Sequence, residues 1–120
     1  MTTENHSHAA HVVFQQRGSC LVAKLLWHRL ESPDVAGAVG RSLTQALKQQ
    51  GSAVQMVRLD FDSVQQISSI ALKELIGFRN SASRQGLSVE ISKAKPHIRE
   101  VFMITRLDRV FSIAENEALT

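Results

Sequence analysis

Residues 57–75, VRLDFDSVQQISSIALKEL, join a predicted strand to a predicted helix. In the first part of this stretch apolar and polar residues alternate, which is the period of a half-buried strand, and the apolar ones are Val57, Leu59 and Phe61. Later apolar residues recur at helical spacing: Ala71, Leu75, Phe78 and Ala82. Ser68 and Ser69 lie where the period changes, and hydroxyl groups there can cap the first free amides of a helix. A phosphoryl group at this place would therefore face a helix N-terminus.

Strand patterns flank this stretch on both sides. Before it, residues 12–14 and 21–27 form two apolar runs with a turn at Gly18 between them, which predicts a hairpin. After it, residues 87–91 alternate between apolar and polar and predict a further strand. Phe111 and Ile113 predict a last short extended segment.

Two more helices are predicted from the residues that start them. Ser32 supplies an N-cap hydroxyl, Pro33 fits the first helical position, and Asp34 places an acid in the first turn. Gly51 is the predicted end of this helix. Its inward face carries Val35, Val39, Leu43, Ala46 and Gln50, with Leu47 beside them. Pro96 opens the other helix. The inward residues of that helix are Ile98, Val101 and Phe102. The order ββαβαβαβ predicts an α/β fold with a mixed β-sheet and helices packed against it.

The composition fits one globular domain. The chain has 120 residues, of which 43% are hydrophobic, and this is an ordinary fraction for a domain of that size. Residues 1–10 are polar and have no period, so they are predicted to form a disordered tail. Residues 11–116 are then the domain, and residues 117–120 are expected to fray.

Cysteine content, charge and hydropathy indicate the cellular compartment of the protein and the kinds of partner that it binds. The single cysteine, Cys20, excludes an internal disulfide and favours a reducing compartment. No apolar run approaches the roughly 20 residues that span a bilayer, and residues 1–10 lack the features of a signal peptide. We therefore expect a cytoplasmic protein without membrane insertion. The net charge of +3 comes from basic residues scattered among acids, which does not favour binding of nucleic acid.

The stretch around the two serines resembles STAS domains, the fold of bacterial anti-sigma-factor antagonists. The residues that carry the resemblance are Asp60, Val64, Ile67 and the sequence SSIAL at residues 68–72. In that family an aspartate-bearing strand and a turn precede Asp-Ser-Ser-Gly-Leu at the start of a helix. Gly86 before a strand also matches, and ITRLDRVF at residues 104–111 is similar to the family's Thr-Gly-Leu-Asp-x-Leu-Phe. The resemblance covers residues 11–116 and implies a single STAS-like domain.

The resemblance implies a regulator of transcription that works by partner switching. Such a protein binds an anti-sigma factor or a histidine-kinase-like serine kinase, is inactivated by phosphorylation, and is reset by a matching phosphatase. Ser69 falls at the family's phosphorylated position, and Ser68 is the alternative acceptor. The chain departs from the motif because Ser68, Ile70 and Ala71 replace its aspartate, second serine and glycine. Glu31 falls where the family has an acidic loop near the partner surface, although a charged loop residue before a helix is an equally good interpretation.

The exposed side of the second helix is the predicted partner surface. At about 100° per residue, Ile70 projects opposite the buried stripe, together with Lys73, Glu74, Gly77 and Ser81. We interpret Ile70 as part of a small apolar patch, with a single exposed apolar residue as the alternative. A glycine inside a helix costs about 1 kcal/mol, which suggests that something packs close to Gly77. The predicted partner-binding residues are Glu31, Ser68, Ser69, Ile70, Lys73 and Gly77.

The sequence carries no pattern typical of an enzyme. It has no glycine-rich phosphate loop, no paired metal-ligand motif and no serine elbow, so we predict no catalytic residue, no cofactor and no metal site. His6, His8 and His11 lack a carboxylate or cysteine at matched spacing. Asp60 and Asp62 resemble a receiver-domain phosphoacceptor, but the acidic partners and the late lysine of such a site are not apparent. A basic cluster is interpreted as a solvated face rather than an anion site: Lys93, Lys95, His97 and Arg99.

Three functions stay open on the sequence alone. The first is an anti-sigma-factor antagonist controlled by phosphorylation at Ser69. The second is an unphosphorylated STAS scaffold in a signalling complex, which the lost aspartate and glycine around Ser69 favour. The third is an accessory STAS subunit of a lipid-transporting ABC system, which binds the ATPase and needs no phosphoserine.

Overall fold

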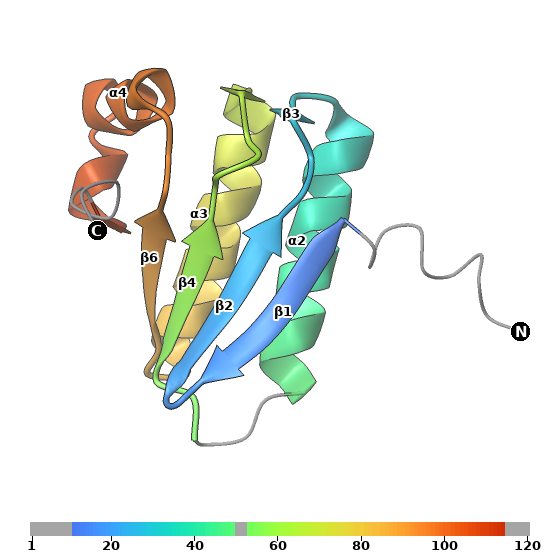
Figure 1. Ribbon diagram of the computed structural model, residues 1–120, viewed down its shortest axis with the longest axis vertical. Helices are drawn as coiled ribbons and strands as arrows, with labels where there is room; N and C mark the ends of the chain where they lie inside the picture. The colour runs from blue at the N-terminus through green and yellow to red at the C-terminus, as the bar shows by residue number, and fades with distance from the viewer. Residues whose placement is uncertain (1–10, 50–52, 115–120) are drawn as a thin grey trace, which may run out of the picture.

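The computed structural model describes residues 11–49 and 53–114, whose main strands form a five-stranded mixed sheet (Figure 1). The strand order is β1-β2-β4-β6-β7, in which β1 is antiparallel to β2 and the other neighbours are parallel. The strands are β1 (Val12–Arg17), β2 (Cys20–Leu25), β4 (Met56–Asp60), β6 (Ser88–Ser92) and β7 (Ser112–Ile113). The hairpin predicted at Gly18 is confirmed, and this glycine has a φ of 61°, which the turn requires.

The helices of the described residues are α2 (Pro33–Gln49), α3 (Ser69–Arg84), α4 (Pro96–Ile104) and the 3₁₀-helix η2 (Leu107–Arg109). Helices α2 and α3 lie side by side behind the sheet, and α4 lies beyond the end of β6 (Figure 1). The start of α2 is as predicted, because Ser32 Oγ accepts a hydrogen bond from the amide of Val35 at 3.1 Å. Its predicted end at Gly51, and Gln50, lie outside the described residues. The α/β class, the mixed sheet and the main order ββαβαβαβ are confirmed.

A second, two-stranded sheet was not expected from the sequence. Strands β3 (Arg29–Leu30) and β5 (Gln66–Ile67) pair in parallel, directly before α2 and α3 respectively. Runs of two residues are too short for a detectable period, so sequence patterns could not predict them. The pair nevertheless fixes the start of α3 beside the start of α2, which matters for the candidate site.

The core lies between the sheet and its helices, and the predicted stripe of α3 is buried in it. Ala71, Leu75, Phe78 and Ala82 are all at most 3% exposed. In α2 the predicted residues Val39, Leu43, Ala46 and Leu47 are buried, and Val35 is partly buried. Around α4, Ile98 and Phe102 are buried and Val101 packs against them. Three phenylalanine rings meet edge to face, with centroid distances of 6.1 and 5.6 Å: Phe61, Phe102 and Phe111.

Two strand boundaries differ from the expectation. Strand β1 continues past Phe14 to Arg17, because an edge strand can pair through polar residues that carry no apolar pattern. Strand β2 ends at Leu25, before Trp27, whose ring stacks on His11 at 4.9 Å. The tail predicted at residues 1–10 and the frayed end at 117–120 lie outside the described residues, so both stay predictions.

Candidate functional site

Ser68 is the N-cap of α3 and connects the start of this helix to the segment that precedes α2. Its hydroxyl accepts a hydrogen bond from the amide of Ala71 at 3.3 Å, as predicted for a capping serine. The same hydroxyl donates to the main-chain carbonyl of Glu31 at 3.0 Å, and the amide of Ser68 donates to the carbonyl of Leu30 at 2.8 Å. Two residues far apart in the sequence are thus brought together, although only the carbonyl of Glu31 contacts the serine. Its carboxylate pairs instead with Arg29 at 3.2 Å.

Ser69 occupies the first position of α3 and differs from its neighbour. It is exposed, and its hydroxyl makes no hydrogen bond within the part of the chain that the structure describes. The first amides of a helix lack intrahelical partners and carry the positive end of the helix dipole. An anionic group on Ser69 would therefore lie in a favourable electrostatic environment.

Ile70, Lys73 and Gly77 extend this exposed surface along successive turns of α3. Ile70 is 43% exposed, which places it outside the core as predicted, and Lys73 and Gly77 are also exposed. The sequence-predicted residues Glu31, Ser68, Ser69, Ile70, Lys73 and Gly77 therefore all belong to the region around the N-terminal half of α3. Their roles in binding a partner stay predictions.

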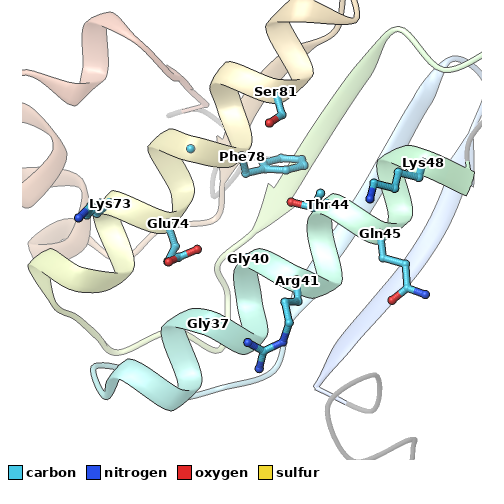
Figure 2. Close-up of a pocket in the computed structure, with 11 residues that line it drawn as sticks. Gly37, Gly40, Arg41, Thr44, Gln45, Lys48, Lys73, Glu74, Phe78 and Ser81 are labelled. Atoms are coloured by element: carbon cyan, nitrogen blue, oxygen red, sulfur yellow. The ribbon is translucent and has the colours of Figure 1, made fainter.

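The prediction that Glu74 and Ser81 face solvent was wrong, because both are half-buried. They point toward α2, and Figure 2 shows the Glu74 side chain reaching from α3 toward Gly40. The Glu74 carboxylate occupies the space that a side chain at position 40 would fill. A helical projection of one segment does not reveal this, because it carries no information on where the neighbouring helix lies.

The close neighbour expected at Gly77 is not present among the described residues. A Cβ atom built at this position would meet no heavy atom within 4 Å. The loss of helix propensity at Gly77 is therefore not offset by tight packing within this part of the chain. Gly77 instead leaves a shallow open place on the exposed side of α3.

A lysine lies beside Asp60, which was not predicted from the sequence. Asp60 is only 6% exposed, accepts a hydrogen bond from the amide of Asp62 at 2.9 Å, and lies 3.8 Å from the ammonium group of Lys93. Lys93 directly follows β6, and β4 and β6 are parallel neighbours, so their carboxyl ends meet at one edge of the sheet. The pair of Asp60 and Lys93 could have been predicted only from the expectation that β4 and β6 are neighbours, because no local motif contains both residues.

The basic cluster near α4 is also more than a solvated face. The Lys95 ammonium group donates to the main-chain carbonyl of Asp62, and the His97 ring contacts the carbonyl of Gln65. Arg99 donates to the carbonyl of Ala94 at 3.1 Å. The bonds of Lys95 and His97 hold the connection between β4 and β5, which leads to Ser68, whereas the bond of Arg99 lies within the turn between β6 and α4.

Two further searches of the described residues gave negative findings. In residues 11–49 and 53–114, no three histidine, cysteine, aspartate or glutamate side chains gather closely enough to bind a metal ion. Of the described helices, none combines the length and the apolar character that crossing a bilayer requires. His6 and His8 lie outside this part of the chain.

The same fold occurs in known proteins. The structure resembles an anti-sigma-factor antagonist (STAS) domain protein of Planctomyces limnophilus with a TM-score of 0.75 at 16% identity, over 89% of this chain and 91% of that one. It also resembles phosphorylated SpoIIAA, a cell fate determinant of Bacillus, with a TM-score of 0.63 at 16% identity, over 90% and 95% of the two chains. At these identities the likeness shows the fold alone.

The fold also occurs within a larger protein of a different kind. The mouse anion transporter Slc26a9 matches with a TM-score of 0.69 at 8% identity, over 82% of this chain and 16% of that one. No curated protein sequence matches the chain. A family model for the STAS domain matches residues 34–119, which is more than half of the sequence. The chain therefore belongs to the STAS domain family.

Proposed function

We propose that this protein is an anti-sigma-factor antagonist that regulates transcription by partner switching in the cytoplasm. The observation that carries the proposal is the exposed hydroxyl of Ser69 at the first position of α3, which makes no hydrogen bond to the described residues and lies directly beside the exposed Ile70. A hydroxyl that can accept a phosphoryl group, next to an apolar residue that contacts a partner, allows phosphorylation to control binding of that partner. The partner is an anti-sigma factor or a histidine-kinase-like serine kinase, and a matching phosphatase reverses the modification.

Ser69 rather than Ser68 is the proposed acceptor. The Ser68 hydroxyl already donates a hydrogen bond to the carbonyl of Glu31 and accepts one from the amide of Ala71. Phosphorylation would remove the proton that the first bond needs and would place negative charge beside the Glu31 carbonyl oxygen. The Ser69 hydroxyl makes none within the described residues. A phosphoryl group on Ser69 adds about −1.5 to −2 charges, which the free helix amides can accept without unfolding the domain.

Phosphorylation would then remove partner binding through desolvation. A contact built around Ser69, Ile70 and Gly77 would have to bury that charge away from water, which costs more than a typical hot-spot contribution of about 2 kcal/mol. The protein itself carries out no catalysis in this scheme. It acts only through which partner it binds.

The test is to capture partners with the tagged protein from an extract of the source cells and identify them by mass spectrometry. We expect a small histidine-kinase-like ATPase, and incubation with that kinase and ATP should place a phosphate on Ser69. Capture of an ABC ATPase, or absence of phosphate on Ser69 after incubation with the captured kinase, would overturn the proposal.

An unphosphorylated scaffold is the second candidate. Ser68 and Ala71 replace the aspartate and glycine of the family's phosphorylation motif, and this departure favours a module that is not a kinase substrate. The two candidates differ in the kinase reaction, because the scaffold binds its signalling complex without being phosphorylated.

A further inference from the structure

A groove runs between α2 and α3 on the outer side of the helical layer (Figure 2). Its volume is about 930 Å³. The ring of Phe78, which is 3% exposed, points into the space between the two helices. The lining on α2 spans residues 37–48, about three turns or roughly 16 Å of helix. A groove of this length matches several turns of a helix laid along it.

Helical glycines make the groove open. Gly37 and Gly40 line it from α2, and Gly77 lines it from α3. All three lie inside helices, where glycine is less favourable than alanine, and a Cβ at Gly77 would meet nothing within 4 Å. Side chains at these positions would narrow the groove. At Gly40 the Glu74 carboxylate already takes up the space of a side chain, and at Gly37 the Arg41 guanidinium lies close by, so the open space that the described part of the chain does not fill is the space at Gly77.

Unpaired positive charge surrounds this space. Arg41, Lys48 and Lys73 line the groove, and none of them makes an ion pair or a side-chain hydrogen bond within the described residues. Elsewhere on the surface basic side chains do have partners, such as Arg29 with Glu31 and Arg58 with Glu90. Glu74 is the one acidic side chain in the described lining, so the lining has an excess of positive charge.

We infer that this groove binds an acidic amphipathic helix of the partner protein. Apolar side chains of that helix would pack over the open position at Gly77, above the buried ring of Phe78, and its carboxylates would pair with Arg41, Lys48 and Lys73. The inference rests on the proposed function and extends it. The partner contact then reaches from Ser69 to the far end of α2, well beyond the phosphorylation site.

The direct test uses NMR titration of the labelled protein with a synthetic helical peptide of about 18 residues, long enough to form a helix, that has leucines on one face and glutamates on the other. We expect the acidic peptide to shift the amide signals of Gly37, Gly40 and Gly77. A control peptide with lysine in place of every glutamate should shift none of them. Equal shifts with both peptides, or shifts that map outside the groove, would overturn the inference.

Charge-reversal variants test the rim of the groove. Reversing two rim charges with Lys48→Glu and Lys73→Glu together should weaken binding of the acidic peptide by at least about tenfold. The control Arg109→Glu, an exposed charge reversal in η2 outside the lining, should leave the affinity within about twofold. Equal losses in the double variant and the control would show that the rim contributes no specific contact.

Filling variants test the glycine-lined floor. Gly77→Leu should reduce peptide binding by at least about tenfold, because it occupies open space in the groove. Ser83→Leu, an exposed position of the same helix outside the lining, is the matched control and should bind normally. Undiminished binding by a folded Gly77→Leu variant would rule out the groove as the binding site.

Lys48 separates this inference from the proposed function, because it lies in the last turn of α2, far along the helix from Ser69. If Lys48→Glu leaves binding of the captured anti-sigma factor unchanged while Ser69→Glu abolishes it, the groove assignment is overturned and the proposed function stands. If the groove binds the acidic peptide but the protein captures no anti-sigma factor, the groove stands and the proposed function fails.

Discussion

Ser69 carries the switch in the proposed function, and two substitutions probe it. Ser69→Ala should keep partner binding, because the native hydroxyl makes no hydrogen bond within the described residues. Ser69→Glu should lose most of it, by about 2 kcal/mol or more, because a carboxylate would have to be desolvated beside Ile70. Calorimetric titration with the captured partner measures both affinities. Equal affinities of Ser69→Glu and the native protein would disprove the switch.

Ser68 has a structural role that can be measured separately. Ser68→Ala removes the N-cap of α3 and the bond to the Glu31 carbonyl, so it should lower the free energy of unfolding by about 1–2 kcal/mol. Ser69→Ala is the matched control and should change it by less than about 0.5 kcal/mol. Urea unfolding followed by circular dichroism gives both values. A Ser68→Ala variant as stable as the native protein would show that the cap contributes little.

Ile70 can be assigned to the surface or to the core by a single variant. Since it is 43% exposed, Ile70→Ser should weaken partner binding by more than about 1 kcal/mol and leave the melting temperature nearly unchanged. Ile104→Ser on α4 is the control, because Ile104 is 72% exposed and lies outside the candidate site. A large drop in melting temperature for Ile70→Ser would instead make it a core residue.

At the residue scale, the sequence predicted where a residue lies within its own helix or strand better than which residues of other elements it contacts. The period of α3 placed Ile70 outside the core, and the period change located the cap at Ser68. Neither the half-burial of Glu74 nor the Lys93–Asp60 pair was predicted. Both depend on a neighbouring helix or strand that is distant in sequence. A local sequence pattern carries no information about where that neighbour lies.

At the element scale, Gly77 makes α3 less stable than it needs to be. Gly77→Ala should raise the free energy of unfolding by about 0.5–1 kcal/mol, because alanine is the better helix former and its methyl group enters open space. In Gly40→Ala the added methyl group would collide with the Glu74 carboxylate, so a smaller gain or a loss is expected. Chemical denaturation of the two variants makes the comparison. Destabilisation by Gly77→Ala would show an undetected close contact.

The elements themselves were largely predictable. Each long helix had a capping serine or an initial proline, and strands β4 and β6 alternated between apolar and polar residues. The pair of β3 and β5 was missed, since two residues form no period. That pair joins Glu31 to Ser68, so the sequence named both residues of the contact but not the small sheet that brings them together.

At the scale of the whole molecule, β4 should be the most protected strand. It is hydrogen-bonded to β2 on one side and β6 on the other, and Val57 and Leu59 are buried beneath the helices. Amide exchange there should require global unfolding, whereas the outward-facing amides of edge strand β1 should exchange faster. Hydrogen exchange followed by NMR resolves the two strands. Faster exchange in β4 than in β1 would contradict this stability distribution.

The strand order also determines how the chain reaches its native state. In the main sheet the described pairings are local only in the β1–β2 hairpin, whereas Cys20 pairs with Met56 and Met56 with Ser88, each across an intervening helix. Parallel partners can meet only after these long crossovers close, and such non-local closure slows folding. During synthesis, β4 cannot acquire its second neighbour until β6 has left the ribosome. The native sheet around β4 therefore forms late, after most of the chain has been made.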